Sequence, residues 1–184
     1  MAIRLFALLA ALDAVSAVPV DSAMMPTYET LASHLLNVRK TLTPGTQHWV
    51  CIAGGPGSGK STLSEGVAAL INKEAGAEVC VVLPMDGFHY TRQKLAELDP
   101  PDASAFMPRR GSPWTFDAEG CYECFAAAKR DRNAILPTYS REISDPVPGG
   151  VQLKESHDIV LAEGVCALHA QAHACTSALR PGSC

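Results

Sequence analysis

The sequence predicts an α/β fold, a three-layer sandwich built on a mostly parallel sheet, and three observations lead to it. Continuous apolar runs of strand length recur at 49–53, 79–83 and 159–162, which is typical of parallel strands buried on both faces. Segments with helical character lie between these runs. A glycine-rich loop joins the first run directly to a helix. Strands that alternate with helices predict β-α-β units and therefore a parallel sheet.

Helices and strands are predicted to alternate in the first half of the chain. A helix is expected over 28–40, followed by a Thr-Pro-Gly loop and the strand 49–53. The helix after the glycine-rich loop is expected to end near Lys73. The β-branched run 79–83 forms the next strand, and a helix follows over 91–98.

The second half continues in the same way after a long polar, proline-rich connection over 99–117. A helix is expected over 118–130, with Asp117 as its N-cap. A short strand and a loop are predicted over 134–150, where proline and glycine are frequent. The last buried strand ends in Glu163.

The glycine-rich loop carries the strongest chemical signal in the chain. Gly54 and the run Gly59-Lys60-Ser61 fit the spacing G-x-x-x-x-G-K-[ST] of a P-loop, and the strand before it and the helix after it are the context that this motif requires. Glycine permits the backbone angles that turn successive amides inward around phosphate oxygens at a helix N-terminus. The predicted nucleotide-binding residues are Gly54, Gly55, Pro56, Gly57, Ser58, Gly59, Lys60, Ser61 and Thr62.

Composition restricts the class of partner. The chain has 184 residues, 47% of them hydrophobic, enough for one sizeable core. Its formal net charge is -4, and lysine and arginine do not cluster with aromatic residues, so a small-molecule substrate is expected and nucleic acid is not. Seven cysteines scattered along the chain indicate a reducing, cytoplasmic location rather than a disulfide scaffold.

The N-terminal segment leaves an alternative open. Arg4, an apolar run and small residues before Ala23 resemble a signal peptide, although Asp13 interrupts the run, and secretion is the lesser alternative. The run is short for a membrane span, and no membrane partner is expected. The predicted organisation is an N-terminal extension over 1–25, a nucleotide-binding domain over 26–164 and a divergent tail over 165–184.

Two carboxylates at strand ends are candidates for chemistry at the phosphates. Ligands of open α/β sheets gather at the carboxyl ends of the strands, which places Asp86 and Glu163 beside the P-loop. Phosphate transfer to a hydroxyl needs a base, a metal ion and cations. Asp86 is the candidate base and Lys60 the catalytic cation, while Ser61 and Glu163 are the candidate Mg²⁺ ligands. The alternative for Asp86 is a turn-forming role.

The acceptor side is less specific. Arg109, Arg110 and Arg141 are candidates to hold an anionic substrate or the transferring phosphate, with solvated surface charge as the alternative. His89 and Tyr90 are candidates to line an acceptor pocket, with packing as the alternative.

Five segments in order carry a resemblance to a known family. The chain resembles the P-loop kinases of the phosphoribulokinase and uridine kinase family over about 31–164. The MDGFH box and the R-G-x-P-x-x-F-D segment are similar to its pantothenate kinase-like and sugar kinase-like branch. The matching segments are GGPGSGKST, LPMDGFHY, RRGSPWTFD, LPTYSREISDPV and HDIVLAEG.

The resemblance implies ATP-dependent phosphorylation of a small-molecule hydroxyl with Mg²⁺. By matching motif, Asp86 is similar to the family's base and Glu163 to its acidic metal-side residue. Tyr139 and Arg141 match residues of its acceptor side. Arg109 and Arg110 match a segment near the acceptor.

The tail departs from the family and keeps a second function open. Family members continue after the strand that ends at Glu163 with an arginine-bearing lid and an adenine-binding strand and loop, whereas 165–184 resembles neither. The fold is therefore expected to be incomplete at its C-terminus. The alternative function is a nucleotide-binding protein or fragment that is impaired in transfer. The Cys and His residues of the tail predict zinc only weakly.

Overall fold

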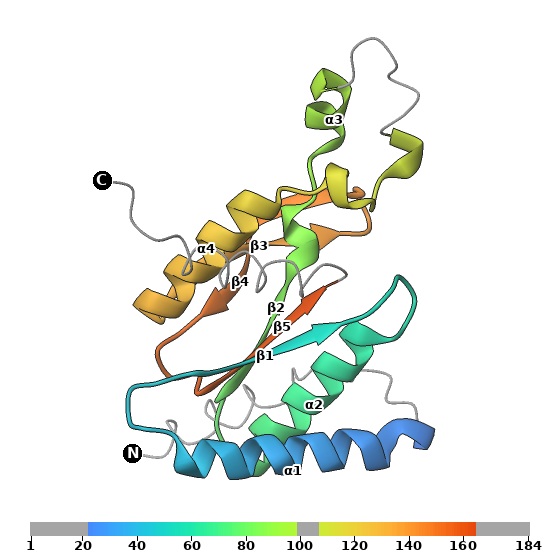
Figure 1. Ribbon diagram of the computed structural model, residues 1–184. Coiled ribbons are helices and arrows are strands. Elements are labelled where there is room, and N and C mark those ends of the chain that lie inside the picture. Colours follow the sequence, from blue (N-terminus) through green and yellow to red (C-terminus); the bar gives the residue numbers. More distant parts are fainter. Residues whose placement is uncertain (1–21, 99–106, 165–184) are drawn as a thin grey trace, which may run out of the picture.

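The computed structural model describes residues 22–98 and 107–164. Its centre is a parallel three-stranded sheet of β1 (His48–Ala53), β5 (Ile159–Gly164) and β2 (Cys80–Pro84), in the order β1-β5-β2 (Figure 1). The strand that comes last in the described chain therefore lies between the other two. Every residue of β5 is buried, which agrees with the continuous apolar run predicted there.

Two helices cover one face of this sheet. Helix α1 (Met25–Thr41), which follows a 3₁₀ turn at Ser22–Met24, packs on α2 (Lys60–Ala75), and both lie below the sheet in Figure 1. The ring of Tyr28 approaches Gly66 so closely that an added Cβ would lie 3.2 Å from it. Side chains of α1, α2, β2 and β5 form one buried cluster between the helices and the sheet. The amphipathic helices are thus held by burial of their apolar faces.

The opposite face carries an antiparallel hairpin and a helix. Strands β3 (Ala134–Ser140) and β4 (Asp145–Leu153) form the hairpin, and α4 (Ala118–Asp131) packs beside it. Leu83 and Val160 of the central sheet lie in one buried cluster with residues of these elements. The three layers are therefore helices α1 and α2, the parallel sheet, and the β3–β4 hairpin together with α4. The predicted α/β fold, the P-loop NTPase three-layer arrangement and the parallel sheet are confirmed.

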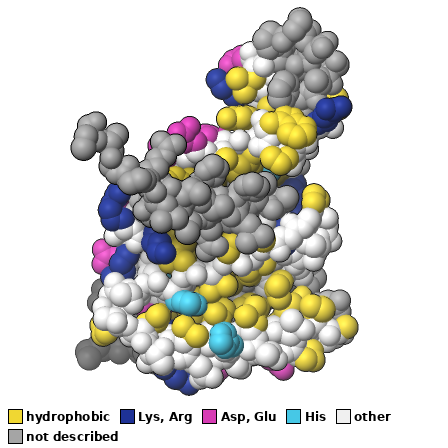
Figure 2. Space-filling model, in the orientation of Figure 1, with side chains coloured by type: hydrophobic (Ala, Val, Ile, Leu, Met, Phe, Trp, Pro, Cys, Tyr) yellow, Lys and Arg dark blue, Asp and Glu magenta, His cyan; other side chains and the backbone are white. Residues whose placement is uncertain are grey.

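Short elements complete the described chain. Three 3₁₀ turns lie at Met85–Phe88, Met107–Arg109 and Pro113–Thr115, and α3 (Arg92–Leu98) follows the first. Asp117 caps α4 as predicted, because its Oδ1 accepts the Gly120 N–H at 2.9 Å. On the face drawn in Figure 2, most of the visible hydrophobic side chains lie in the lower half of the molecule, and the visible charged side chains lie mostly towards its outline. None of the described helices is both long and apolar enough to cross a membrane.

One predicted element is wrong. The segment 134–150 was expected to hold a short strand and a loop, but its second half begins the nine-residue strand β4. Pro146 and Pro148 are tolerated because β4 is at the edge of a two-stranded sheet. The pairing also shifts along β4, from Val151 opposite Leu136 to Val147 opposite Thr138, so the proline-glycine segment forms a bulge rather than a loop.

The other predicted helices and strands are present, with ends that differ by a few residues. The predicted N-terminal extension over 1–25 lies outside the described residues except for 22–25, which form the 3₁₀ turn and the first residue of α1. The predicted divergent tail over 165–184 lies outside them. The division into domains stays a prediction.

Asn72 ties helix α2 to strand β2. Its Oδ1 accepts the N–H groups of Val79 and Cys80, each at 2.8 Å, and its Nδ2 donates to the Cys80 carbonyl at 2.9 Å. Asn72→Ala should therefore lower the free energy of unfolding by about 2 to 3 kcal/mol, because partly buried backbone groups lose their partners. Urea unfolding measures this difference. The control is Lys73→Ala on the exposed side of the same helix, which should stay within about 0.5 kcal/mol of the parent. Equal effects of the two changes would contradict the role of Asn72.

Candidate functional site

The P-loop connects the end of β1 to the start of α2, as the motif predicts. Two of its glycines adopt left-handed backbone angles, with φ of 74° at Gly57 and 82° at Gly59. Gly59 is the N-cap of α2 and has no side chain to satisfy the first amides of the helix. These amides therefore stay available to an anion, and the helix dipole favours one.

Contacts inside the loop maintain its shape. The Ser58 N–H donates to the Gly55 carbonyl at 3.2 Å, and Lys60 Nζ donates to the same carbonyl at 3.0 Å. An added Cβ at Gly54 would lie 2.6 Å from Ser58 Oγ, so a larger residue at this position would displace the Ser58 side chain. Residues 55–59 are exposed. The loop is thus ordered internally and open on the side where a phosphate chain would bind.

Glu163 reaches this loop from the centre of the sheet. In the register of β5 it lies between Ile52 of β1 and Pro84 of β2, and it is 4% exposed. Ser61 Oγ donates to Glu163 Oε1 at 3.1 Å. Burial raises the pKa of Glu163 above its ordinary value; the hydrogen bond from Ser61 opposes this rise, and the nearby charge of Asp86 adds to it.

Ser61 and Glu163 fit the ligand chemistry of Mg²⁺. A hydroxyl and a carboxylate are hard oxygen donors, and they lie at hydrogen-bond distance from each other at the start of α2. The described residues contain no group of three or more His, Cys, Asp or Glu side chains suited to a metal. A kinase-type Mg²⁺ site needs few protein ligands, because nucleotide phosphates and water supply the rest.

Asp86 lies on the 3₁₀ turn that follows β2, two residues after the partner of Glu163. Two glycines allow this turn to pack closely. A Cβ at Gly87 would collide with the Pro137 carbonyl of β3, and one at Gly164 would lie 2.7 Å from Met85 Cβ. The turn is therefore held between β3 and the end of β5. This packing brings Asp86 near Glu163, and the charge of Asp86 contributes to the raised pKa of Glu163.

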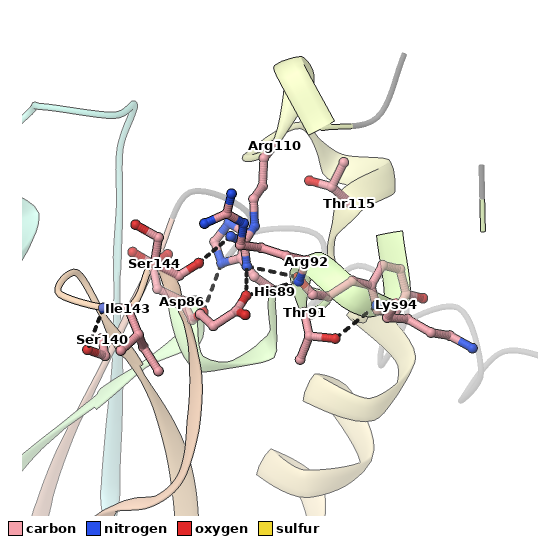
Figure 3. Close-up of polar contacts among 12 residues, drawn as sticks. Asp86, His89, Thr91, Arg92, Lys94, Arg110, Thr115, Ser140, Ile143 and Ser144 are labelled. Atoms are coloured by element: carbon pink, nitrogen blue, oxygen red, sulfur yellow. Dashed lines mark hydrogen bonds and ion pairs between the residues drawn. The ribbon is translucent and has the colours of Figure 1, made fainter. Parts of the chain in front are cut away.

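Three rings line the region beside Asp86. The His89 ring lies 5.2 Å from Phe116 and 5.5 Å from Tyr139, measured between ring centroids. His89 Nδ1 lies 2.8 Å from the Asp86 carbonyl oxygen (Figure 3). A carbonyl oxygen only accepts, so Nδ1 carries the proton of this hydrogen bond and the neutral ring presents Nε2 as an acceptor. His89 and Tyr139 are thus brought together from segments fifty residues apart.

The predicted arginines are placed differently from one another. Arg109 and Arg141 are exposed, and neither forms an ion pair within the described part of the chain. Arg110 points inward: its guanidinium forms an ion pair with Asp145 at 2.5 Å and lies 5.5 Å from the centre of the Tyr139 ring. Tyr90 contributes its backbone carbonyl to this network.

Phe116 and Asp145 belong to the site and were not singled out from the sequence. Both lie inside segments that carried the family resemblance, RRGSPWTFD and LPTYSREISDPV, so motif membership was the available signal. Their contacts depend on chain segments that meet only in the folded protein: Phe116 forms an isolated β-bridge with His89, and Asp145 pairs with Arg110.

Comparisons with known proteins agree with the predicted resemblance. The chain is 38% identical over 115 residues to the "Putative uridine kinase C227.14" of Schizosaccharomyces pombe, an alignment that covers 61% of this chain and 48% of that protein. It is 31% identical over 114 residues to the pantothenate kinase of Streptococcus agalactiae, with 62% and 35% covered. No model of a protein family matches the chain.

A solved structure gives the same relation. The crystal structure of a "putative fructose transport system kinase" from Silicibacter sp. TM1040 aligns with a TM-score of 0.62 and 33% identity, over 75% of this chain and 63% of that one. The relation to P-loop kinases of the phosphoribulokinase and uridine kinase family is confirmed. The chain spans between about a third and a half of the length of these two curated relatives.

The buried carboxylate of Glu163 should reduce the stability of the metal-free protein. A raised pKa means that the folded state binds the Glu163 proton more tightly than the unfolded state, so stability falls as pH rises from the ordinary value of 4.5 through the folded-state pKa. In EDTA, Glu163→Gln should therefore raise the free energy of unfolding at pH 8. This gain should shrink as pH falls from the folded-state pKa of Glu163 towards 4.5, and it should be absent well below 4.5. Urea unfolding across this pH range measures it.

The matched control is Glu123→Gln, the same change on the exposed side of α4. It should have an effect within about 0.5 kcal/mol across the pH range. A Glu163→Gln protein that is less stable than the parent at every pH would contradict a destabilising buried charge.

Proposed function

We propose that this relative of P-loop kinases is the nucleotide-binding and catalytic part of an ATP-dependent kinase that phosphorylates a hydroxyl group of a small-molecule metabolite. The observation that carries the proposal is the meeting of the P-loop, Glu163 and Asp86 at one edge of the sheet, where β1, β5 and β2 end side by side. Such an arrangement supplies phosphate contacts, a metal ligand and a base within one small region.

The nucleotide side is assigned to the P-loop residues 54–62. Their backbone amides and the N-terminus of α2 surround the phosphates, and Lys60 neutralises the negative charge that develops during transfer. The bond from Lys60 Nζ to the Gly55 carbonyl keeps the ammonium group at the loop before nucleotide binds. Ser61 and Glu163 hold Mg²⁺, which neutralises phosphate charge when it is bound.

The acceptor side is assigned to Asp86 and the rings beside it. The acceptor oxygen forms a bond to the γ-phosphorus while the bond between that phosphorus and the bridging oxygen of ADP breaks. Asp86 takes the proton that the acceptor hydroxyl loses. His89 and Tyr139 line the acceptor pocket, with Nε2 of His89 available to accept a hydrogen bond from the substrate. Arg109 and Arg141 attract acceptors that carry negative charge.

Nucleotide binding should depend on Lys60. A ligand that binds only the folded state raises stability by mass action, by about 2.7 kcal/mol at a free concentration of 100 times Kd. Mg-ATP should therefore raise the melting temperature of the parent protein, and Lys60→Ala should remove most of this shift. Thermal unfolding with and without Mg-ATP measures it. Lys73→Ala, at the other end of α2, should keep the full shift. A full shift in Lys60→Ala as well would contradict the assigned site.

Phosphate transfer should depend on Asp86 without a matching loss of nucleotide affinity. Asp86→Asn keeps the size of the side chain but removes the base, which should lower kcat by a factor of about 10² to 10⁴. ADP production in the presence of a panel of small alcohols, sugars and hydroxy acids measures turnover, and the thermal shift reports nucleotide binding. Full turnover in Asp86→Asn would show that another group takes the proton. A parent protein that binds Mg-ATP and transfers phosphate to no acceptor would favour the impaired alternative.

A further inference from the structure

The side chain of Arg110 links three segments of chain beside the acceptor region. Its Nη1 donates to the Ser144 carbonyl, and its Nη2 donates to the Tyr90 carbonyl at 3.1 Å and to Asp145 Oδ1 at 2.5 Å. Tyr90 lies two residues after the 3₁₀ turn that carries Asp86, and Ser144 and Asp145 lie at the tip of the β3–β4 hairpin. Figure 3 shows Arg110 reaching from its own segment towards Ser144 and the turn that carries Asp86 and His89.

Asp145 extends the link to a fourth element. The same Oδ1 that pairs with Arg110 accepts the backbone N–H of Arg92 at 3.0 Å, at the first residue of α3. The pair is largely enclosed, with side-chain exposures of 14% for Arg110 and 26% for Asp145. Nε of Arg110 is buried and has no hydrogen-bond partner among the described residues. Both terminal nitrogens of the guanidinium are committed to internal partners, and Asp145 neutralises its charge.

The geometry points to the Arg110–Asp145 pair as a positioning pair, called the clamp below, that holds Tyr139 and His89 beside Asp86. It is not a ligand for an anionic substrate. The guanidinium lies against the Tyr139 ring, which in turn contacts His89. A planar group that bonds to two carbonyls and a carboxylate while it packs on a ring fixes orientations that a flexible ammonium cannot. Through the Tyr90 carbonyl it also holds the segment that directly follows the Asp86 turn.

The direction in which Asp145→Asn changes the acceptor KM distinguishes a clamp from a direct ligand. This comparison rests on the proposed kinase function. If Arg110 bound an anionic acceptor, Asp145→Asn would remove a competing charge and lower the KM for that acceptor. If the pair is a clamp, Asp145→Asn and Arg110→Gln should both raise the acceptor KM, by about tenfold or more, and leave the KM for ATP within twofold. The double variant should be no worse than either single one, because both remove the same link.

A conservative variant sharpens the comparison. Arg110→Lys retains the charge opposite Asp145 but lacks the planar guanidinium with its fixed donor geometry, so its acceptor KM should lie between those of the parent and Arg110→Gln. The matched control is the exposed ion pair Arg130–Asp131 on α4, with side-chain exposures of 72% and 55%. Arg130→Gln and Asp131→Asn should leave both KM values unchanged.

Backbone hydrogen exchange tests the clamp even if the proposed kinase function fails. Asp145→Asn and Arg110→Gln should speed exchange at the Arg92 amide and across β3 and β4 by at least tenfold, with α2 unchanged and with the Mg-ATP thermal shift retained. Exchange equal to that of the parent in both variants, or a lower acceptor KM in Asp145→Asn, would overturn the clamp. A parent protein with no transferase activity and these exchange effects would retain the clamp and reject the kinase.

Discussion

The insertion of β5 between β1 and β2 is the constraint on which the site depends. Hydrogen bonds to both neighbours fix the register of β5, and this register places Glu163 beside the last residues of the other two strands. A shift by one residue would turn Glu163 to the opposite face and away from Ser61. The parallel pairing therefore positions the carboxylate more firmly than any contact of the side chain itself does.

Burial of Glu163 connects this constraint to chemistry. The carboxylate is enclosed by the sheet and lies near a second acid, Asp86, so its pKa is raised in the protein without ligands. A buried carboxylate is costly to the fold, and a cation bound beside it would reduce that cost. The site thus resembles others in which stability of the free protein is lower so that a charged ligand binds well.

The acceptor side depends on close packing between segments that are distant in the chain. Gly87 lets the turn that carries Asp86 pack directly on β3, and the Arg110–Asp145 pair connects that turn to the hairpin tip. The glycine contact and the ion pair both determine where the backbone of the turn lies relative to the hairpin. They explain why the segments with the family resemblance include glycine and arginine beside the residues assigned to chemistry.

The sequence by itself determined the alternation of strands and helices, the P-loop and the identity of the two strand-end acids, because periodicity and glycine spacing are local properties. It missed β4, since proline and glycine predict loops unless an edge strand with a bulge is known to accept them. It offered Arg110 as a candidate to hold an anionic substrate, with solvated surface charge as the alternative, and it did not show that the fold encloses this side chain and pairs it with Asp145. Tertiary structure decided these points, because pairing partners and burial depend on segments that come together only when the chain folds.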